Sequence, residues 1–553
     1  MRTRHTKALA TLLSGLLGAS PLRHASFRLF YFGSIGVALG YTMQATIAAW
    51  LMATLTPSAF MVALVQTAST APTLLFGLVA GALADIADRR RIILITQIVL
   101  FTAALILGVA TVAGITGPAA LLALTFLIGA GFTFYLPAQQ ASVNELVSRA
   151  ELPRAVALSA VAFNVARAIG PALAGAIAAW GGSGTAFLAG ALFFTLMLVA
   201  LRGWKGRERA LPGVPERLLS GIQSGLRYAR HSAAMRSLII RNLNFSVCAS
   251  AFWALLPVIA RDQLGLGAGG FGLLSAGFGT GAVIGALSIP RQLQSRSLNK
   301  VVTSGVLLWT VAILLVAVSH ITVIGIVGAC CAGVAWVTVF ASLSTGTQST
   351  APAWVRARAV AMNILAVQAS LAIGSALWGA LASAVGISIA LVGSAALMIA
   401  LHLLNRRVRV AMGTEADVTP GVQLPDMAIA VEPLPDDGPV LIQIEYRVDP
   451  ENRKPFLRAI HAVETIRRRN GATSWRVFRD LAEDGRFVER YIITSWAEYI
   501  RLRSRMTLGE RRLLDHVEQF QREGVPISIS RLIGVNPLDA QFDARDPDVE
   551  KKD

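Results

Sequence analysis

The chain has 553 residues, of which 54% are hydrophobic and only 15% charged, and its mean hydropathy is +0.59. This composition excludes an ordinary soluble globular protein and predicts a membrane protein with many spanning segments. The net charge of +18 is uneven, because residues 1–404 carry 26 Lys and Arg against 7 Asp and Glu, whereas residues 405–553 carry 24 against 25. The basic residues lie between apolar runs and not on one face of a soluble domain, which argues against a nucleic-acid partner.

Residues 1–26 form a basic, partly apolar segment, which we expect to be a cytoplasmic lead-in and not a signal peptide. Twelve apolar runs follow, each close to the ~20 residues that cross about 30 Å of hydrocarbon. They cover residues 27–51, 59–83, 92–113, 119–138, 155–179, 185–201, 238–260, 271–289, 301–319, 322–343, 359–384 and 387–404. We therefore predict an α-helical polytopic fold with twelve transmembrane helices.

The connections between these runs differ in charge. Lys and Arg gather in alternate connections, such as 89–91, 202–237 and 291–300, whereas the other connections carry only Arg261. By the positive-inside rule both termini are then cytoplasmic. The long basic loop, residues 202–237, separates a first six-helix half, residues 27–201, from a second half, residues 238–404.

One apolar run is repeated in the other half. Residues 154–177 read RAVALSAVAFNVARAIGPALAGAI and residues 358–381 read RAVAMNILAVQASLAIGSALWGAL, with 12 of 24 positions identical. The shared glycines suit close helix contact, whereas Pro171 is matched by Ser375. A spanning helix repeated at half the chain is typical of a transporter built from two halves.

The last 149 residues read differently, as a linker and a soluble domain. Residues 405–439 begin with arginines and continue with Pro and acidic residues, so we expect a linker without a core. Residues 440–535 alternate as strand, helix, strand, strand, helix and strand, which predicts a soluble α+β domain of ferredoxin-like topology, and residues 536–553 form an acidic tail. No His or Cys grouping has metal-ligand spacing, so we expect neither a metal nor another cofactor.

The turn between the second and third runs, residues 81–91, reads GALADIADRRR. It resembles the signature loop of the major facilitator superfamily. The resemblance implies that Gly81 permits close helix packing, that Asp85 caps a neighbouring helix, and that Arg89 and Arg90 pair across the two halves. Asp88 stands where the family has glycine, and a loop that only fixes membrane topology is the alternative.

The run PAQQASVNELV, residues 137–147, and the repeat after it resemble the transmembrane secretion effector branch of that superfamily, which is similar to the enterobactin exporter. The segments GATSW, VER and TSW, at residues 471–475, 488–490 and 494–496, resemble antibiotic-biosynthesis-monooxygenase domains. The resemblance implies a secondary transporter, not an enzyme, that exports a small amphiphilic compound such as a siderophore, drug or secondary metabolite across the bacterial cytoplasmic membrane. It also implies a homodimer through the soluble domain, because such domains often pair through their sheets.

Gly170 and Pro171, with Gly175, resemble the antiporter motif of exporters, in which a kinked helix bends and reseals during turnover. Arg167 is the one basic residue at the middle of a run, so it needs a partner or a wet cavity. It either lines a central cavity and binds an anionic group, or forms a fixed ion pair, for example with Glu145.

Uncharged amides complete the candidate binding site, in the spans that line the cavity in this superfamily. They are Gln44, Gln140, Asn164, Asn244 and Gln368. Hydrogen bonding between helices is the alternative role for each of them.

No Asp or Glu lies in the core of a run, which leaves Glu145 as the candidate for the proton coupling that the family implies. Two other functions stay open at this point. The first alternative is a membrane-anchored enzyme that acts through an oxygenase-like C-terminal domain. The second is a sensor that binds a ligand among its helices and signals through that domain.

Overall fold

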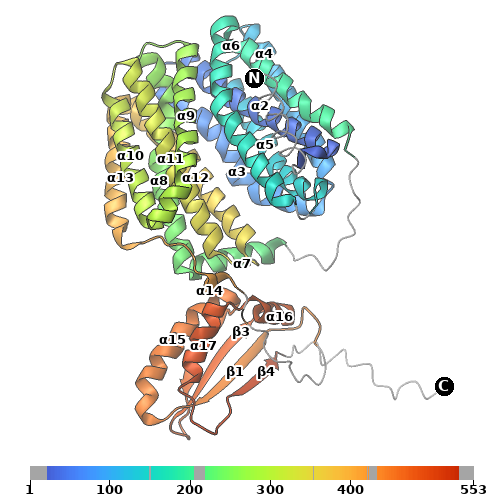
Figure 1. The fold of residues 1–553 in the computed structure, drawn as a ribbon, viewed down its shortest axis with the longest axis vertical. Coiled ribbons are helices and arrows are strands. Elements are labelled where there is room, and N and C mark those ends of the chain that lie inside the picture. The colour runs from blue at the N-terminus through green and yellow to red at the C-terminus, as the bar shows by residue number, and fades with distance from the viewer. Residues whose placement is uncertain are drawn as a thin grey trace, which may run out of the picture. The chain divides into compact units, whose positions relative to one another are not determined.

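The computed structural model describes residues 21–148, 151–204, 218–352, 354–419, 421 and 433–534. The chain divides into two compact units. The first unit comprises residues 1–214, 239–344 and 363–409 and is helical, and the second comprises residues 215–238, 345–362 and 410–553 and contains the sheet (Figure 1). The only sheet in the described chain has four strands.

Eleven of the described helices are long and apolar enough to cross a membrane. In the first half they are α2 (Ala25–Leu55), α3 (Ala59–Ile86), α4 (Arg89–Val112), α5 (Pro118–Leu146) and α6 (Leu152–Arg202), and in the second α8 (Ala233–Val258), α9 (Ala268–Ser295), α10 (Leu298–Val318), α11 (Thr322–Thr350), α12 (Arg356–Val385) and α13 (Ile387–Leu404). Twelve runs were expected, and the fifth and sixth both lie within α6. The backbone of α6 leaves the helical region at Gly182, with φ 83° and ψ 169°, which separates the two runs as predicted.

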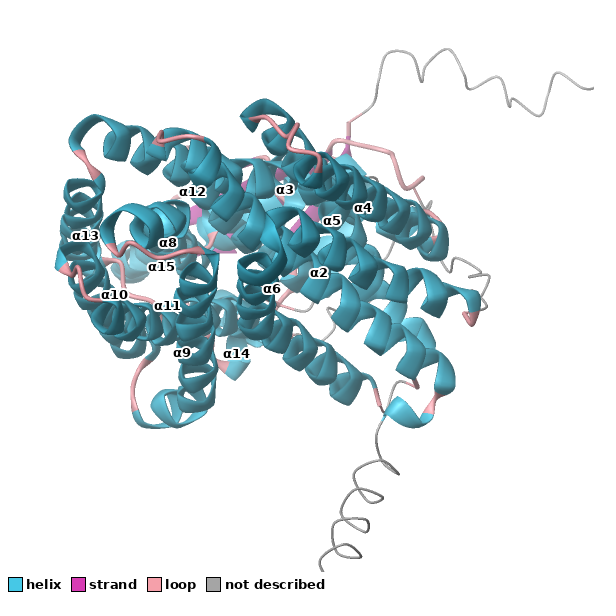
Figure 2. Ribbon diagram, turned by 90° about the horizontal axis from the view of Figure 1, so that it is seen from above, coloured by secondary structure: helices cyan, strands magenta, loops and turns pink. Residues whose placement is uncertain are grey.

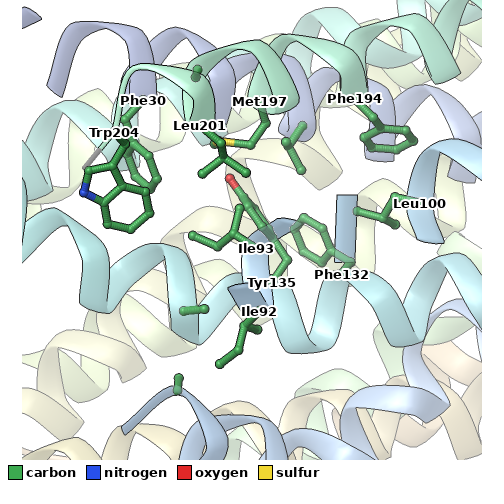
Figure 3. Close-up of a cluster of buried hydrophobic side chains, with 14 of the residues drawn as sticks. Phe30, Ile92, Ile93, Leu100, Phe132, Tyr135, Phe194, Met197, Leu201 and Trp204 are labelled. Atoms are coloured by element: carbon green, nitrogen blue, oxygen red, sulfur yellow. The ribbon is translucent and has the colours of Figure 1, made fainter. Parts of the chain in front are cut away.

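The helices of each half gather together (Figure 2). In the first half, α2 packs along α6, and large side chains fill the space between α2, α4, α5 and α6. Phe30 and Trp204 meet edge to face with ring centroids 5.6 Å apart, and Phe194 and Leu100 are fully buried at the other side of the same cluster (Figure 3). This core stays within one half, so the half can move as a body.

The repeated glycines make equivalent contacts in the two halves. A Cβ at Gly170 would lie 2.1 Å from Thr42 Oγ1 of α2, and one at Gly374 would lie 2.3 Å from Ser250 Oγ of α8, so each packs inside its own half. The second pair joins the halves. A Cβ at Gly175 would lie 2.7 Å from Gly272 Cα of α9. In the same way, one at Gly379 would lie 2.3 Å from Ala63 Cβ of α3.

The second unit holds a four-stranded antiparallel sheet in the order β2-β3-β1-β4. Its elements are β1 (Val440–Arg447), α15 (Arg453–Asn470), β2 (Ser474–Arg479), β3 (Arg486–Ile493), α16 (Trp496–Arg505), α17 (Leu508–Glu518) and β4 (Ser528–Ile533). The single helix expected after β3 is two helices, because Thr507 begins α17 with a capping box closed by Glu510. Two further helices were not expected, α7 (Leu218–His231) from the basic loop and α14 (Glu415–Val418) from the predicted linker.

A buried ion pair lies in the core of this soluble domain. Glu489 is fully buried and accepts hydrogen bonds from Arg467 Nε at 2.9 Å, Trp475 Nε1 at 2.9 Å and the Tyr446 hydroxyl at 3.2 Å. Burial and the neighbouring Glu489 carboxylate raise the pKa of Tyr446 well above its usual value, so its hydroxyl stays a donor. Every polar group of the set is satisfied, which identifies a structural network rather than a reactive centre.

Candidate functional site

Arg167 of α6 stands at the end of a row of aromatic rings. Its guanidinium carbon lies 6.0 Å from the centre of the Phe163 ring. Phe163 stacks on Phe132 with centroids 6.4 Å apart, and Phe132 stacks on Tyr41 at 3.9 Å with an interplanar angle of 11°. Phe132 is buried in the core of the first half, with Tyr41 and Phe163 half-buried against it, so the row places the Arg167 cation beside a stack of aromatic rings.

The charge of Arg167 is not neutralised by the described part of the chain. The side chain is half-buried, and no described residue forms an ion pair or hydrogen bond with its guanidinium. The ion pair expected with Glu145 as an alternative is wrong, since Glu145 has another partner. A cation left unpaired among apolar helices must face water or bind an anion.

Glu145 instead pairs with Arg89, with Oε1 and Nη1 2.5 Å apart. Arg89 Nε and Nη1 also donate to the carbonyl oxygens of Ala84 and Ala141, each at 3.1 Å. Arg90 Nη2 donates to the carbonyl oxygen of Leu201 at 3.1 Å. All of these partners lie in the first half, so the predicted pairing of the arginines across the two halves is wrong for this conformation.

Asp88 begins α4. Its Oδ1 accepts from the backbone N–H groups of Arg90 and Arg91 at 2.9 and 3.4 Å, which makes it the N-cap of that helix. The side chain of Asp85, for which a capping role was predicted, lies outside the described residues. No described residue lies within 4 Å of a Cβ placed at Gly81, so the close helix contact expected there stays a prediction.

The predicted amides do not form one site. Gln44 is buried and donates to the carbonyl oxygen of Phe187 at 2.8 Å, which ties α2 to α6 inside the first half. Its side chain also lines a cavity of about 10 Å³ enclosed by α2, α3, α4 and α5. This hydrogen bond supports the alternative role of Gln44 as a bond between helices, and its binding role stays a prediction.

The other four amides have different surroundings. Gln140 is exposed and Gln368 half-buried. Asn244 is half-buried, and its Nδ2 is shielded from solvent and has no hydrogen-bond partner among the described residues. The side chain of Asn164 lies outside the described residues. Asn244 is thus the amide with an unused donor, and the binding role of the remaining three stays a prediction.

The halves touch from one end of the helices to beyond their middle, where a Cβ at Gly279 of α9 would lie 2.6 Å from Ala168 Cα of α6 and one at Gly77 of α3 would lie 3.3 Å from Leu365 Cδ2 of α12. The hydrogen bonds between the halves lie toward that end. Besides Gly175 against Gly272, the Phe60 N–H donates to Ser383 Oγ at 2.8 Å, and Thr67 Oγ1 donates to the carbonyl oxygen of Ala372 at 2.8 Å. These residues belong to the starts of α3 and α9 and to the later turns of α6 and α12, at the end opposite Arg89 and Glu145. Pro171 takes part in this contact, since a Cβ at Gly272 would lie 3.2 Å from its carbonyl oxygen, and α6 stays helical around it.

Sequence reasoning missed the aromatic row. Phe163 lies four residues before Arg167, so the two were visibly on one helix face, but Tyr41 and Phe132 come from other helices. A second aromatic group, also missed, lies in the other half, where Trp253 meets Phe278 with ring centroids 4.5 Å apart. Pairing of this kind between distant helices leaves no pattern in the sequence.

Two helical halves, a repeated helix at their contact and a cation without an ion-pair partner among the described residues are features of a polytopic membrane transporter. The chain belongs to the transmembrane secretion effector family of the major facilitator superfamily, whose sequence profile matches residues 17–537. It is therefore a transporter and not an enzyme.

Curated relatives are distant. The staphyloferrin A transporter of Staphylococcus aureus is 25% identical over 246 residues, an alignment that spans 44% of this chain but only 62% of that protein. The multidrug efflux pump Tap of Mycolicibacterium fortuitum is 27% identical over 380 residues, which cover 65% of this chain and 90% of the pump.

Solved structures share the helical fold at low sequence identity. A bacterial homologue of the human lysosomal transporter Spinster, in an inward-facing and unoccupied conformation, superposes with a TM-score of 0.59 at 13% identity. It covers 70% of this chain and 98% of its own. A POT family transporter in complex with 5-aminolevulinic acid gives a TM-score of 0.58 at 13% identity, covering 70% and 96%. These likenesses establish the fold alone.

Proposed function

We propose that the protein exports a small amphiphilic anion across the bacterial cytoplasmic membrane by alternating access. The observation that carries the proposal is Arg167, an unneutralised cation beside three stacked rings, which suits a compound with an acidic group and an apolar body. A relative named as a multidrug efflux pump supports export, and one named as a staphyloferrin A transporter supports a siderophore among the candidate compounds.

The charge pattern supports a direction. With both termini cytoplasmic by the positive-inside rule, the end at which the halves touch is the outer end. The conformation is then inward-facing, which is the state in which an exporter takes its cargo from the cytoplasm. The inward-facing Spinster homologue has the same fold. Pro171 and Gly175 on α6 would be the positions at which the outer seal opens and re-forms, while Gly170 holds α6 against α2 within the first half.

We further propose that export is coupled to protons through Glu145, because the resemblance to the family implies proton coupling. Its bond to Arg89 offers a coupling device, because protonation of the carboxylate would release the arginine. Glu145→Gln should abolish the stimulation of transport by a pH gradient in proteoliposomes, with the matched exposed-acid variant Asp262→Asn unchanged. Equal stimulation in wild type and Glu145→Gln would rule out this residue.

The soluble domain would serve assembly. The four-stranded antiparallel sheet, in the order β2-β3-β1-β4, is consistent with the ferredoxin-like topology expected from the order of its elements. Leu441 pairs with both Ile492 and Leu532, which places an apolar patch at one end of the outer sheet face, and Leu532 is 53% exposed. A homodimer formed through this patch would cover it.

The direct test of the binding site replaces Arg167. Arg167→Gln should lower export of an acidic amphiphile at least about tenfold, since a charge-assisted contact of this kind contributes about 1.5–3 kcal/mol. Arg167→Lys should retain part of it. Export by Arg167→Gln that equals wild-type export, at equal amounts of protein in the membrane, would contradict the proposed binding site.

A further inference from the structure

A cavity in the second half collects positive charge. It has a volume of about 420 Å³ and lies between the last turns of α9 and the facing turns of α10 and α11. Arg291 and Arg296 line it together with the polar side chains of Gln292, Ser304 and Thr338. Its size is that of a site for a small ligand or a headgroup, and not that of a packing defect.

The charges of this cavity have no counterpart in the chain around them. No described residue forms an ion pair or hydrogen bond with the guanidinium of Arg291 or Arg296. The reason lies in the sequence, because residues 218–404 contain one acidic residue, Asp262, and it is engaged by its neighbour Arg261. An anion for the cavity must therefore come from outside the second half.

The first half has an acidic partner for the arginine of its corresponding turn. Its corresponding turn, between α3 and α4, carries Arg89, which Glu145 of α5 neutralises. The repeat offset of 204 residues places Ser349 where Glu145 stands in the first half. In the first half, an acidic residue of the same half neutralises an arginine of this loop. In the second half, the arginines of the corresponding loop have no such partner among the described residues.

The surroundings of the cavity point to a lipid. Its base is apolar, formed by Leu308 and Val334. The outer surfaces of the same helices carry exposed apolar side chains, among them Leu287 of α9 at 74% and Leu307 of α10 at 49% exposure. An amphiphile could place a phosphate between the arginines and its chains along this surface, whereas a soluble anion would use only the arginines.

We propose that this cavity binds the headgroup of an anionic phospholipid. The arginines hold the phosphate by charge-assisted hydrogen bonds, the hydroxyl and amide groups bind the glycerol end, and the acyl chains stay in the bilayer. This assignment needs only that the helices lie in a membrane, and it stands apart from the direction and substrate of transport.

Native mass spectrometry of the full-length protein in detergent tests the assignment. The wild type, titrated with phosphatidylglycerol, should retain one lipid about tenfold more tightly than it retains phosphatidylcholine. Arg291→Gln/Arg296→Gln should lose this preference, and Arg291→Lys/Arg296→Lys should keep most of it. Equal retention of phosphatidylglycerol by wild type and the glutamine variant would overturn the proposal.

A matched control removes the same charge elsewhere. Arg202→Gln/Arg236→Gln replaces two exposed arginines outside the cavity and should retain the lipid as the wild type does. Competition separates the two sources of phosphate. Glycerol 3-phosphate should displace the lipid only at concentrations far above those of phosphatidylglycerol, and displacement at equal concentration would assign the cavity to a soluble anion instead. The wild-type comparisons decide the question even if the glutamine variant fails to fold.

Discussion

At the scale of single residues, two arginines show opposite solutions to the burial of a charge. Arg467 in the soluble domain is paired with Glu489, whose other hydrogen bonds come from Trp475 and Tyr446. Arg167 among the membrane helices meets only an aromatic ring in the described part of the chain. A balanced charge stabilises a core, and an unbalanced one marks a place for a ligand.

The buried pair gives a stability prediction. Glu489→Gln should destabilise the soluble domain by about 3–5 kcal/mol, because it leaves Arg467 buried without a counter-charge. Hydrogen exchange of the β3 amides in the full-length protein measures the effect. Glu464→Gln is the control, since Glu464 forms an exposed pair with Arg468 within one helix and should change exchange little. Equal protection in both variants would show that the buried pair does not stabilise the domain.

At the scale of elements, the glycines of the repeat explain how α6 and α12 serve both halves. Gly170 and Gly374 pack within a half, whereas Gly175 and Gly379 pack between halves. The first pair therefore belongs to the rigid bodies and the second to the seal between them.

This division predicts different effects of adding one methyl group. Gly175→Ala would place a Cβ against the backbone of Gly272, so the seal should separate and the closed outer end become accessible. Solvent accessibility of a cysteine placed at Ala268 measures the opening. Gly267→Ala, at a position with free space, should leave it unchanged. An unchanged accessibility in Gly175→Ala would contradict the role given to this contact.

Sequence alone was sufficient for the spanning helices and for the four strands of the soluble domain, because apolar runs and alternation are local signals. It was insufficient where the outcome depends on which surfaces meet. The pairing of Arg89 with Glu145 and the bond from Gln44 to Phe187 depend on helix packing. The break between the fifth and sixth runs was also predicted, since residues 180–184 lie between them and Gly182 is where the backbone of α6 leaves the helical region.

At the scale of the whole molecule, the orientation in the membrane decides whether the end at which the halves are in contact faces the outside or the cytoplasm. The prediction that both termini are cytoplasmic can be tested at the two ends of α10, where Lys300 and His320 are exposed. A cysteine at His320 should react with a membrane-impermeant reagent in intact cells, and one at Lys300 only after permeabilisation. The reverse labelling pattern would show that both termini lie outside the cytoplasm, and the conformation would then be outward-facing.

The central claim, export of an acidic amphiphile through the site at Arg167, is tested most directly by where such compounds accumulate. Untargeted mass spectrometry should compare medium and cells of strains that carry the wild type or Arg167→Gln at equal amounts. We predict that an acidic amphiphile accumulates in the medium of the strain with the wild type and inside the cells of the strain with Arg167→Gln. An acidic amphiphile depleted from the medium by the wild type, or no difference between the strains, would contradict it.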